Sequence, residues 1–98
     1  MSAYVIANIE VTNAERYPEY VKLAGSTPAR YGGRYLVRGG SAVVKEGDAP
    51  VHRLVILEFP SMEQALTWYD SDEYRAARVL RHAYAHSQIT FVEGVPAA

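Results

Sequence analysis

The order of apolar patterns along the chain limits its fold more than any other feature. Period-two alternation of apolar residues, which is typical of strands, covers residues 3–11, 34–45, 51–59 and 88–93. Helical spacing covers residues 17–31, with a break expected around 25–28, and occurs again over 62–80 with a restart at Ser71. The predicted order is strand, helix, strand, strand, helix, strand. A chain of 98 residues is long enough for one such domain.

Glycine and cap residues divide these patterns into elements. Gly32-Gly33 is expected to end the first helical region, and Ser61 begins a capping box for the second. Gly39-Gly40 interrupts the second strand pattern, either as a bulge in one long strand or as a separate tight turn. Residues 46–50 are predicted to form the loop between the two central strands. Residues 94–98 are predicted to be a loose tail.

This order matches the ferredoxin-like βαββαβ unit, an α+β fold. We expect an antiparallel sheet with both helices on one face, in a single domain over residues 1–98 with an ordered core of about 3–94. The other face of the sheet is left open. Its predicted apolar residues are Tyr4, Ile6, Leu36, Leu54 and Ile56. An open apolar face needs a partner, so we expect a homodimer in which two such sheets face each other.

Charge and composition exclude several classes of function. Ten basic residues balance eleven acidic ones, for a net charge of −1, so no footprint for nucleic acid or an anionic membrane is present. The absence of cysteine excludes disulfides and thiolate chemistry. We expect no signal peptide at the start, and the longest strongly apolar run, 54–57, is far too short to span a bilayer. We therefore expect a cytoplasmic location.

The two central strands provide the sharpest prediction of a site. Counting back from a loop at 46–50 places Arg38 opposite or next to Glu58, on one face of the sheet. A bulge at Gly39-Gly40 would shift this match by one residue. The pair is then either a salt bridge that fixes strand register or a site for a polar substrate. In the second case Glu58 is the base and Arg38 anchors an anion.

Histidines and aromatic residues give weaker signals. His82 and His86 have a spacing seen among zinc ligands, but no third ligand is spaced with them, so we expect no metal site. His52 is expected to be an ordinary half-buried residue. Tyr35 and Trp68 either pack in the core or form the walls of a pocket between helices and sheet. Phosphate-binding glycine motifs and nucleophile motifs are absent from the sequence.

Four stretches of sequence resemble those of a known family. They are AYVIANIEV, YGGRYLVRGG, EGD followed by RLVILEFPS, and WYDSDEYRAAR. Together they resemble domain of unknown function (DUF) family 1330 over residues 3–94. The resemblance implies a dimeric α+β barrel, in a wider class that includes cofactor-independent monooxygenases, small isomerases and haem-handling proteins. It also implies as motif positions Tyr31, Gly32, Gly33, Arg38, Gly39, Arg53, Glu58, Trp68, Ser71 and Tyr74.

The favoured function is a small cofactor-independent enzyme, isomerase-like or monooxygenase-like, that acts on a small organic molecule between sheet and helices. The expected catalytic residues are Glu58 and Arg38, and the expected substrate-binding residues are Tyr35, Trp68, Arg53 and Tyr74. No metal or other cofactor is expected. The alternative is a non-catalytic dimeric module that binds a small molecule or assists another protein. Binding of RNA is disfavoured by the nearly neutral charge.

Overall fold

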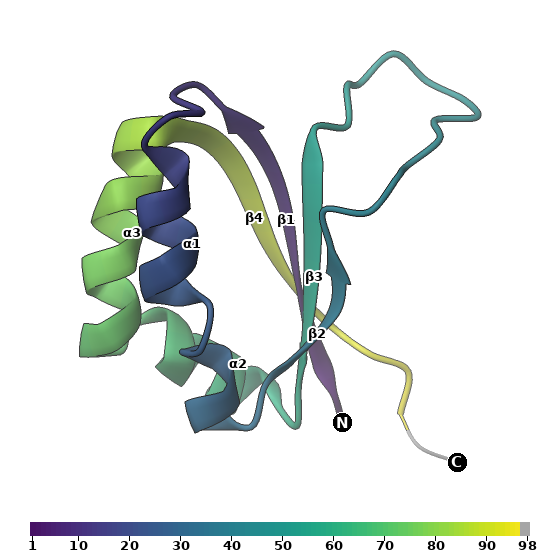
Figure 1. The fold of residues 1–98 in the computed structure, drawn as a ribbon. Helices are drawn as coiled ribbons and strands as arrows, with labels where there is room; N and C mark the ends of the chain where they lie inside the picture. Colours follow the sequence, from purple (N-terminus) through teal and green to yellow (C-terminus); the bar gives the residue numbers. More distant parts are fainter. Residues whose placement is uncertain (97–98) are drawn as a thin grey trace.

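Within residues 1–96, which the computed structural model describes, the chain forms a four-stranded antiparallel sheet covered by helices on one face (Figure 1). The elements are β1 (Ala3–Val11), α1 (Tyr17–Ala24), the 3₁₀ helix η1 (Pro28–Tyr31), β2 (Arg34–Arg38), β3 (Arg53–Phe59), α2 (Met62–Tyr69), α3 (Asp72–Tyr84) and β4 (Ala85–Glu93). The strand order β2-β3-β1-β4, with antiparallel neighbours throughout, confirms the predicted ferredoxin-like fold.

The central strand β1 separates a buried face from an open one. Val5, Ala7 and Ile9 point toward the helices and are at most 8% exposed. They join a core whose aromatic centre is Phe59 and Trp68, with ring centroids 5.3 Å apart. Each large apolar side chain buried in this way contributes about 1.5–3 kcal/mol to stability. The core therefore lies entirely between the sheet and the helices.

The predicted helix starts at Ser61 and Ser71 are confirmed, each with a side-chain cap. The hydroxyl of Ser61 accepts a hydrogen bond from the Gln64 amide at 3.1 Å, and that of Ser71 accepts one from the Tyr74 amide at 3.2 Å. Gly32 follows η1 with φ of 80°, a conformation that favours glycine, so the predicted stop is confirmed there. No helix in residues 1–96 combines the length and the apolar character that crossing a membrane requires.

The helical spacing predicts inner faces made of Met62, Ala65, Leu66 and Tyr69 and, after Ser71, of Tyr74, Ala77 and Leu80. Two of these positions are wrong. Leu66 is 46% exposed, and Trp68 takes the buried position of α2 instead. On α3 the most buried position of the last turns belongs to Arg81, which is 2% exposed, while Leu80 is only half-buried. The rest of the predicted inner faces is confirmed, since Ala65, Tyr74 and Ala77 are at most 3% exposed.

The last strand begins earlier than predicted. α3 passes directly into β4 at Ala85, three residues before the predicted start. His82 therefore lies in the helix and His86 in the strand, so they share no helical face. Gly94 donates its amide hydrogen to the Ser2 carbonyl at 2.8 Å, so the predicted loose tail is still held at its first residue. The tail's last two residues, 97–98, lie outside the described residues.

The connection between β2 and β3 differs most from the prediction. β2 ends at Arg38, and residues 39–52 form an exposed arm that extends away from the helices (Figure 1). Gly39 still donates its amide hydrogen to the Leu54 carbonyl, but its φ of 72° then turns the chain out of the ladder. The arm returns at Asn8, whose side chain bonds the backbone of Pro50 and His52. The predicted long strand and the loop at 46–50 are both replaced by this arm.

The register of β2 against β3 also corrects the predicted ion pair. Arg34 lies opposite Glu58, whereas Arg38 lies opposite Val55. A one-residue bulge between Tyr35 and Val37 changes the alternation, so Arg38 points toward the helices and Glu58 points to the open face. Counting back from a tight loop fails because residues 39–52 are not a tight loop. Arg38 and Glu58 are therefore on opposite faces of the sheet.

Glu58 has other partners on the open face. Arg34 donates from its Nε to a Glu58 carboxylate oxygen at 2.7 Å, and the Tyr4 hydroxyl donates to the second oxygen at 3.1 Å. These hydrogen bonds hold the pKa of Glu58 below its ordinary value of 4.5. The cluster joins β1, β2 and β3 and fixes their register.

The substitution Glu58→Gln tests this cluster. Because the pKa of Glu58 is lowered in the folded state, its ionised form stabilises the fold at neutral pH, and this contribution is lost as pH falls through the folded pKa, below 4.5. The free energy of unfolding of the wild type should exceed that of Glu58→Gln at neutral pH, and the difference should shrink in acid. Urea unfolding at fixed protein concentration over this pH range measures it. Glu10→Gln, an exposed carboxylate on the same sheet face, is the control. A difference that does not change with pH would contradict the assignment.

Candidate functional site

A hollow lies between the sheet and the helices. Its enclosed volume is about 50 Å³, and the space free of protein atoms rises to about 580 Å³ only when the open solvent at its mouth is included. Its lining is Val5, Ala7, Ile9, Tyr17, Tyr20, Val21, Ala24, Gly25, Tyr35, Arg38, Arg53, Val55, Leu57, Trp68, Tyr74 and Ile89. Strands β1 to β4 supply its floor, and α1, α2 and α3 supply its wall.

Five of the six residues predicted for a site lie in this lining. They are Arg38, Tyr35, Arg53, Trp68 and Tyr74. The sixth, Glu58, is on the other face of the sheet, so the prediction that it is the base of this site is wrong. The predicted location between sheet and helices agrees with the position of the hollow.

Two guanidinium groups reach the hollow from neighbouring strands. Arg38 is exposed and therefore lies at the mouth, where it stacks 4.2 Å above the ring of Tyr35. The Tyr35 hydroxyl in turn donates to the Gly25 carbonyl at 3.2 Å, which connects β2 to the end of α1. Arg53 is half-buried, and its Nε is buried with no hydrogen-bond partner among residues 1–96. Neither guanidinium forms an ion pair within that range.

Tyrosine hydroxyls supply the other polar atoms of the hollow. The hydroxyl oxygens of Tyr20 and Tyr74 lie 2.9 Å apart and share a hydrogen bond. Burial raises the pKa of Tyr20, and it also raises the pKa of Tyr17 and Tyr35. These three hydroxyls therefore stay protonated at neutral pH, where they act as hydrogen-bond donors. The lining contains no aspartate, glutamate or histidine among residues 1–96.

Arg81 lies behind the tyrosines without reaching the lining. It donates from its Nη2 to the Tyr69 hydroxyl at 3.4 Å, and its Nε has no partner among residues 1–96. Its positive charge opposes the effect of burial on the pKa of Tyr20. Tyr20 and Arg81 were not predicted from the sequence as residues at or near the site. A signal existed for each, since Tyr20 is on the apolar stripe of α1 and Arg81 follows Tyr74 by seven residues on the inner stripe of α3.

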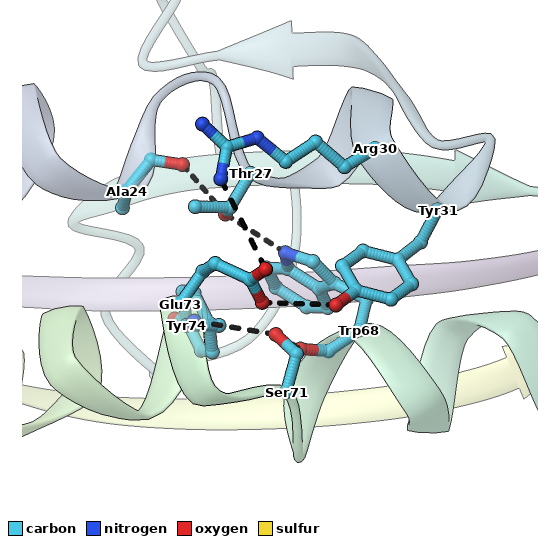
Figure 2. Close-up of polar contacts among 8 residues, drawn as sticks. All are labelled: Ala24, Thr27, Arg30, Tyr31, Trp68, Ser71, Glu73 and Tyr74. Atoms are coloured by element: carbon cyan, nitrogen blue, oxygen red, sulfur yellow. Dashed lines mark hydrogen bonds and ion pairs between the residues drawn. The ribbon is translucent and has the colours of Figure 1, made fainter.

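The position of Trp68 is fixed by a buried hydrogen bond. Figure 2 shows its indole Nε1 donating to the Thr27 hydroxyl, at 3.0 Å, while that hydroxyl donates to the Ala24 carbonyl at 2.7 Å. The Ser71 hydroxyl donates to the Trp68 carbonyl at 2.7 Å and caps α3 through Tyr74. The ring of Trp68 stacks on Tyr74 with centroids 4.2 Å apart. Both aromatic walls of the hollow are thus held by contacts outside it.

The outer side of this network joins η1 to α3. The hydroxyl of Tyr31 donates to the Glu73 carboxylate at 2.9 Å, and Arg30 lies 4.0 Å from the same side chain (Figure 2). A hydrogen bond from the backbone amide of Glu73, followed by the one from Tyr31, holds the pKa of the Glu73 carboxyl below its ordinary value. These contacts explain Tyr31 and Ser71 as structural residues. No three His, Asp or Glu side chains gather as metal ligands in the part of the chain that the structure describes.

A family model matches nearly the whole chain. It is described as Domain of unknown function (DUF1330), and it matches residues 2–95. This match agrees with the resemblance seen in the sequence. No match was found among the curated proteins.

Several solved structures share the fold at low sequence identity. The protein of unknown function RPA0582 from Rhodopseudomonas palustris superposes with a TM-score of 0.78 at 19% identity, over 98% of this chain and 84% of that one. SnoaB, a cofactor-independent oxygenase from Streptomyces nogalater, gives 0.65 at 9% identity, over 98% and 95%. A putative antibiotic biosynthesis monooxygenase from Caulobacter crescentus CB15 gives 0.66 at 18% identity, over 97% and 91%. At these identities the similarity supports the fold alone.

The hydrogen bond between Trp68 and Thr27 can be tested by Thr27→Val. This change keeps the shape of the side chain but leaves the buried indole donor without a partner, which should cost about 1–3 kcal/mol. Thr67→Val, which removes a hydroxyl from an exposed position on α2, should change stability by less than about 0.5 kcal/mol. Urea unfolding followed by circular dichroism measures both. Equal losses in the two variants would contradict the buried role of Thr27.

Proposed function

This chain belongs to the DUF1330 family, and from that premise we propose that it is a small cofactor-independent enzyme acting on a small organic molecule. The molecule binds in the hollow between the sheet and the helices. One observation carries the proposal: the two guanidinium groups of Arg38 and Arg53 line an otherwise apolar and aromatic hollow without a carboxylate beside them among residues 1–96. Sites of this composition, mostly apolar with a few convergent polar groups, are typical of small-molecule binding.

The lining is suited to a reaction in which the substrate first loses a proton and reacts as its anion. A ketone or phenol that loses a proton becomes an enolate or phenolate, and a guanidinium group stabilises its oxygen in a hollow of low polarity. Arg38 keeps its predicted role as anion anchor, and Arg53 joins it. Because the lining has no carboxylate or imidazole within residues 1–96, the substrate loses its proton to water and must itself be acidic.

Two reaction classes follow from such an anion. In isomerisation the proton returns to a different carbon. In oxygenation the anion reacts with dioxygen: one oxygen atom replaces two hydrogens of a methylene group as a carbonyl, and the other leaves with those hydrogens as water. This balance needs no added reductant. The fold shared with a cofactor-independent oxygenase supports the second class.

A non-catalytic binding module is the second candidate. The observation that favours it is the same lack of a carboxylate or imidazole in the lining among residues 1–96. Such a module binds the molecule but leaves its rate of proton exchange unchanged. The two candidates are therefore separated by a measurement of proton transfer.

β-Tetralone, a neutral aromatic ketone with an acidic methylene group, is the probe for this comparison. The enzyme should accelerate exchange of its methylene hydrogens in heavy water, or its uptake of dioxygen, by about a hundredfold over buffer. Arg53→Gln should reduce the acceleration by at least about tenfold, since it removes one stabilising donor. Nuclear magnetic resonance and an oxygen electrode measure the two rates. Binding without acceleration would support the binding module, and no binding would overturn both candidates.

We also propose a homodimer formed through the open sheet face. Ile6 pairs with Ile56 on this face, and Leu36 is 45% exposed at its edge. The chain measures 43 × 38 × 16 Å, and its accessible surface of 6303 Å² exceeds the roughly 5,600 Å² expected for a compact monomer of its mass. The exposed arm contributes apolar surface to the excess, including Val43 at 81% exposure. A second copy on the flat open face would cover this surface.

The cytoplasmic location stays a prediction from the sequence.

The dimer predicts a doubled mass in light scattering at micromolar concentration. Ile6→Glu places a charge in the middle of the open face and should shift the mass to that of a monomer, because an unpaired charge in an interface is strongly unfavourable. Val79→Glu, on an α3 position that is 67% exposed, should leave the mass unchanged. A wild-type monomer, or the same shift in both variants, would overturn the proposal.

A further inference from the structure

We infer that the ligand of the hollow is a small organic acid with an apolar body, held as its anion between Arg38 and Arg53. This inference rests on the proposed function and names its substrate class. The two guanidinium groups come from adjacent strands. Arg38 lies opposite Val55 on β3, and Arg53 precedes Val55 by two residues and so shares its face. Residues related in this way are diagonal neighbours about 7–8 Å apart.

Two positive charges that enter one hollow from adjacent strands repel each other, and an anion bound beside them would relieve that repulsion. Elsewhere in the chain, most arginine charges are balanced by a nearby carboxylate. Four other arginines form ion pairs with carboxylates, namely Arg16, Arg30, Arg34 and Arg78. Arg38, exposed at the mouth, and Arg53, half-buried, form none within residues 1–96. An anion bound in the hollow would supply a partner for both, with the larger effect at the half-buried Arg53.

Of the two arginines, Arg53 is the one whose lack of a partner is clearest. Its Nε is buried and has no acceptor among residues 1–96, so its full hydrogen-bonding capacity is not used. Its guanidinium also packs tightly against Gly39, where an added Cβ would collide with Nη1. The backbone thus leaves space for the guanidinium at this position. A carboxylate or enolate oxygen in the hollow would pair with the charge of this guanidinium.

A third cation, Arg81, adds to the positive charge near the hollow and so also favours a negatively charged ligand. Arg81 is 2% exposed and has no ion-pair partner within residues 1–96. Its field acts on the Tyr20 and Tyr74 hydroxyls, which line the hollow. The positive potential around the hollow thus comes from three arginines: Arg81, which is buried, Arg53, which is half-buried, and Arg38, which is exposed at the mouth. A neutral or cationic ligand would leave this potential without a counter-charge.

The apolar lining defines the other end of the ligand. Trp68, Tyr35 and the aliphatic residues of β1 and β3 surround the remaining space, and they offer no further charged groups. An inorganic anion would leave these walls without a contact, and a polyanion such as a nucleotide would place several charges against mostly apolar walls. A single acidic group on an aromatic or alicyclic body matches both parts of the lining.

The only tryptophan of the chain, Trp68, lines the hollow and reports binding through its fluorescence. The probes are benzoate and naphthoate, each compared with its neutral amide of the same shape. The carboxylates should bind at least about tenfold more tightly than the amides, and their affinity should fall with added salt. Arg38→Gln and Arg53→Gln should each reduce carboxylate affinity about tenfold or more and leave amide affinity unchanged.

Two further variants make the test specific. Arg75→Gln removes an exposed positive charge of α3 outside the lining, and it should change neither affinity by more than about twofold. Arg53→Lys keeps the charge but loses the fork, so its carboxylate affinity should lie between those of the wild type and Arg53→Gln. Unchanged amide binding in each variant shows that the hollow is still folded, so loss of structure cannot imitate the result.

Three results would overturn the inference: equal affinity for carboxylate and amide, an equal loss in Arg75→Gln, or no carboxylate binding at millimolar concentration. The outcomes separate it from the proposed function. Acceleration of β-tetralone exchange without a preference for carboxylates would retain the enzyme and reject the acidic ligand. Arginine-dependent binding of carboxylates without any acceleration would retain the acidic ligand and reject the enzyme.

Discussion

The bulge in β2 decides what each face of the sheet carries. Side chains alternate along a strand, so Arg34 and Arg38, four residues apart, would point to the same face of a regular strand. The extra residue between Tyr35 and Val37 reverses the alternation. Arg34 then meets Glu58 on the open face, while Arg38 joins Tyr35 in the hollow. The composition of the site and the salt bridge of the open face both depend on this one irregularity.

Local patterns predicted most of the fold because the interactions that form it are local. Ser61 and Ser71 cap their helices within four residues, and the alternation of β1 places its buried face without reference to other strands. The predicted pair of Arg38 and Glu58 failed because register between strands depends on the length of the connection and on the bulge. Neither quantity is visible in the pattern of residues 34–59. An exposed arm of polar and small residues looks like a strand when it contains an alternating apolar run such as the one near Val43.

The fold brings most of the residues predicted for a site into one hollow, and their role in binding stays a prediction. Arg53, Tyr35, Trp68 and Tyr74 were expected in a pocket between sheet and helices, and the hollow contains all of them. Residue types and family resemblance were sufficient for this, because they do not require a register. Arg81 could not be found in the same way. A charged residue on the inner stripe of a helix is ordinarily assigned to the surface, and only the tyrosines around it make the buried position tolerable.

Net charge does not describe the distribution of charge around the hollow. A total of −1 excludes a strongly basic surface, and the sequence supports no more than that. The carboxylates that balance this sum lie outside the hollow, and several of them are paired with other arginines. The hollow therefore keeps a positive local potential inside a nearly neutral molecule. Because potential falls off within about 10 Å in salt, the arrangement of charges around a site, rather than their sum, determines which ligand it attracts.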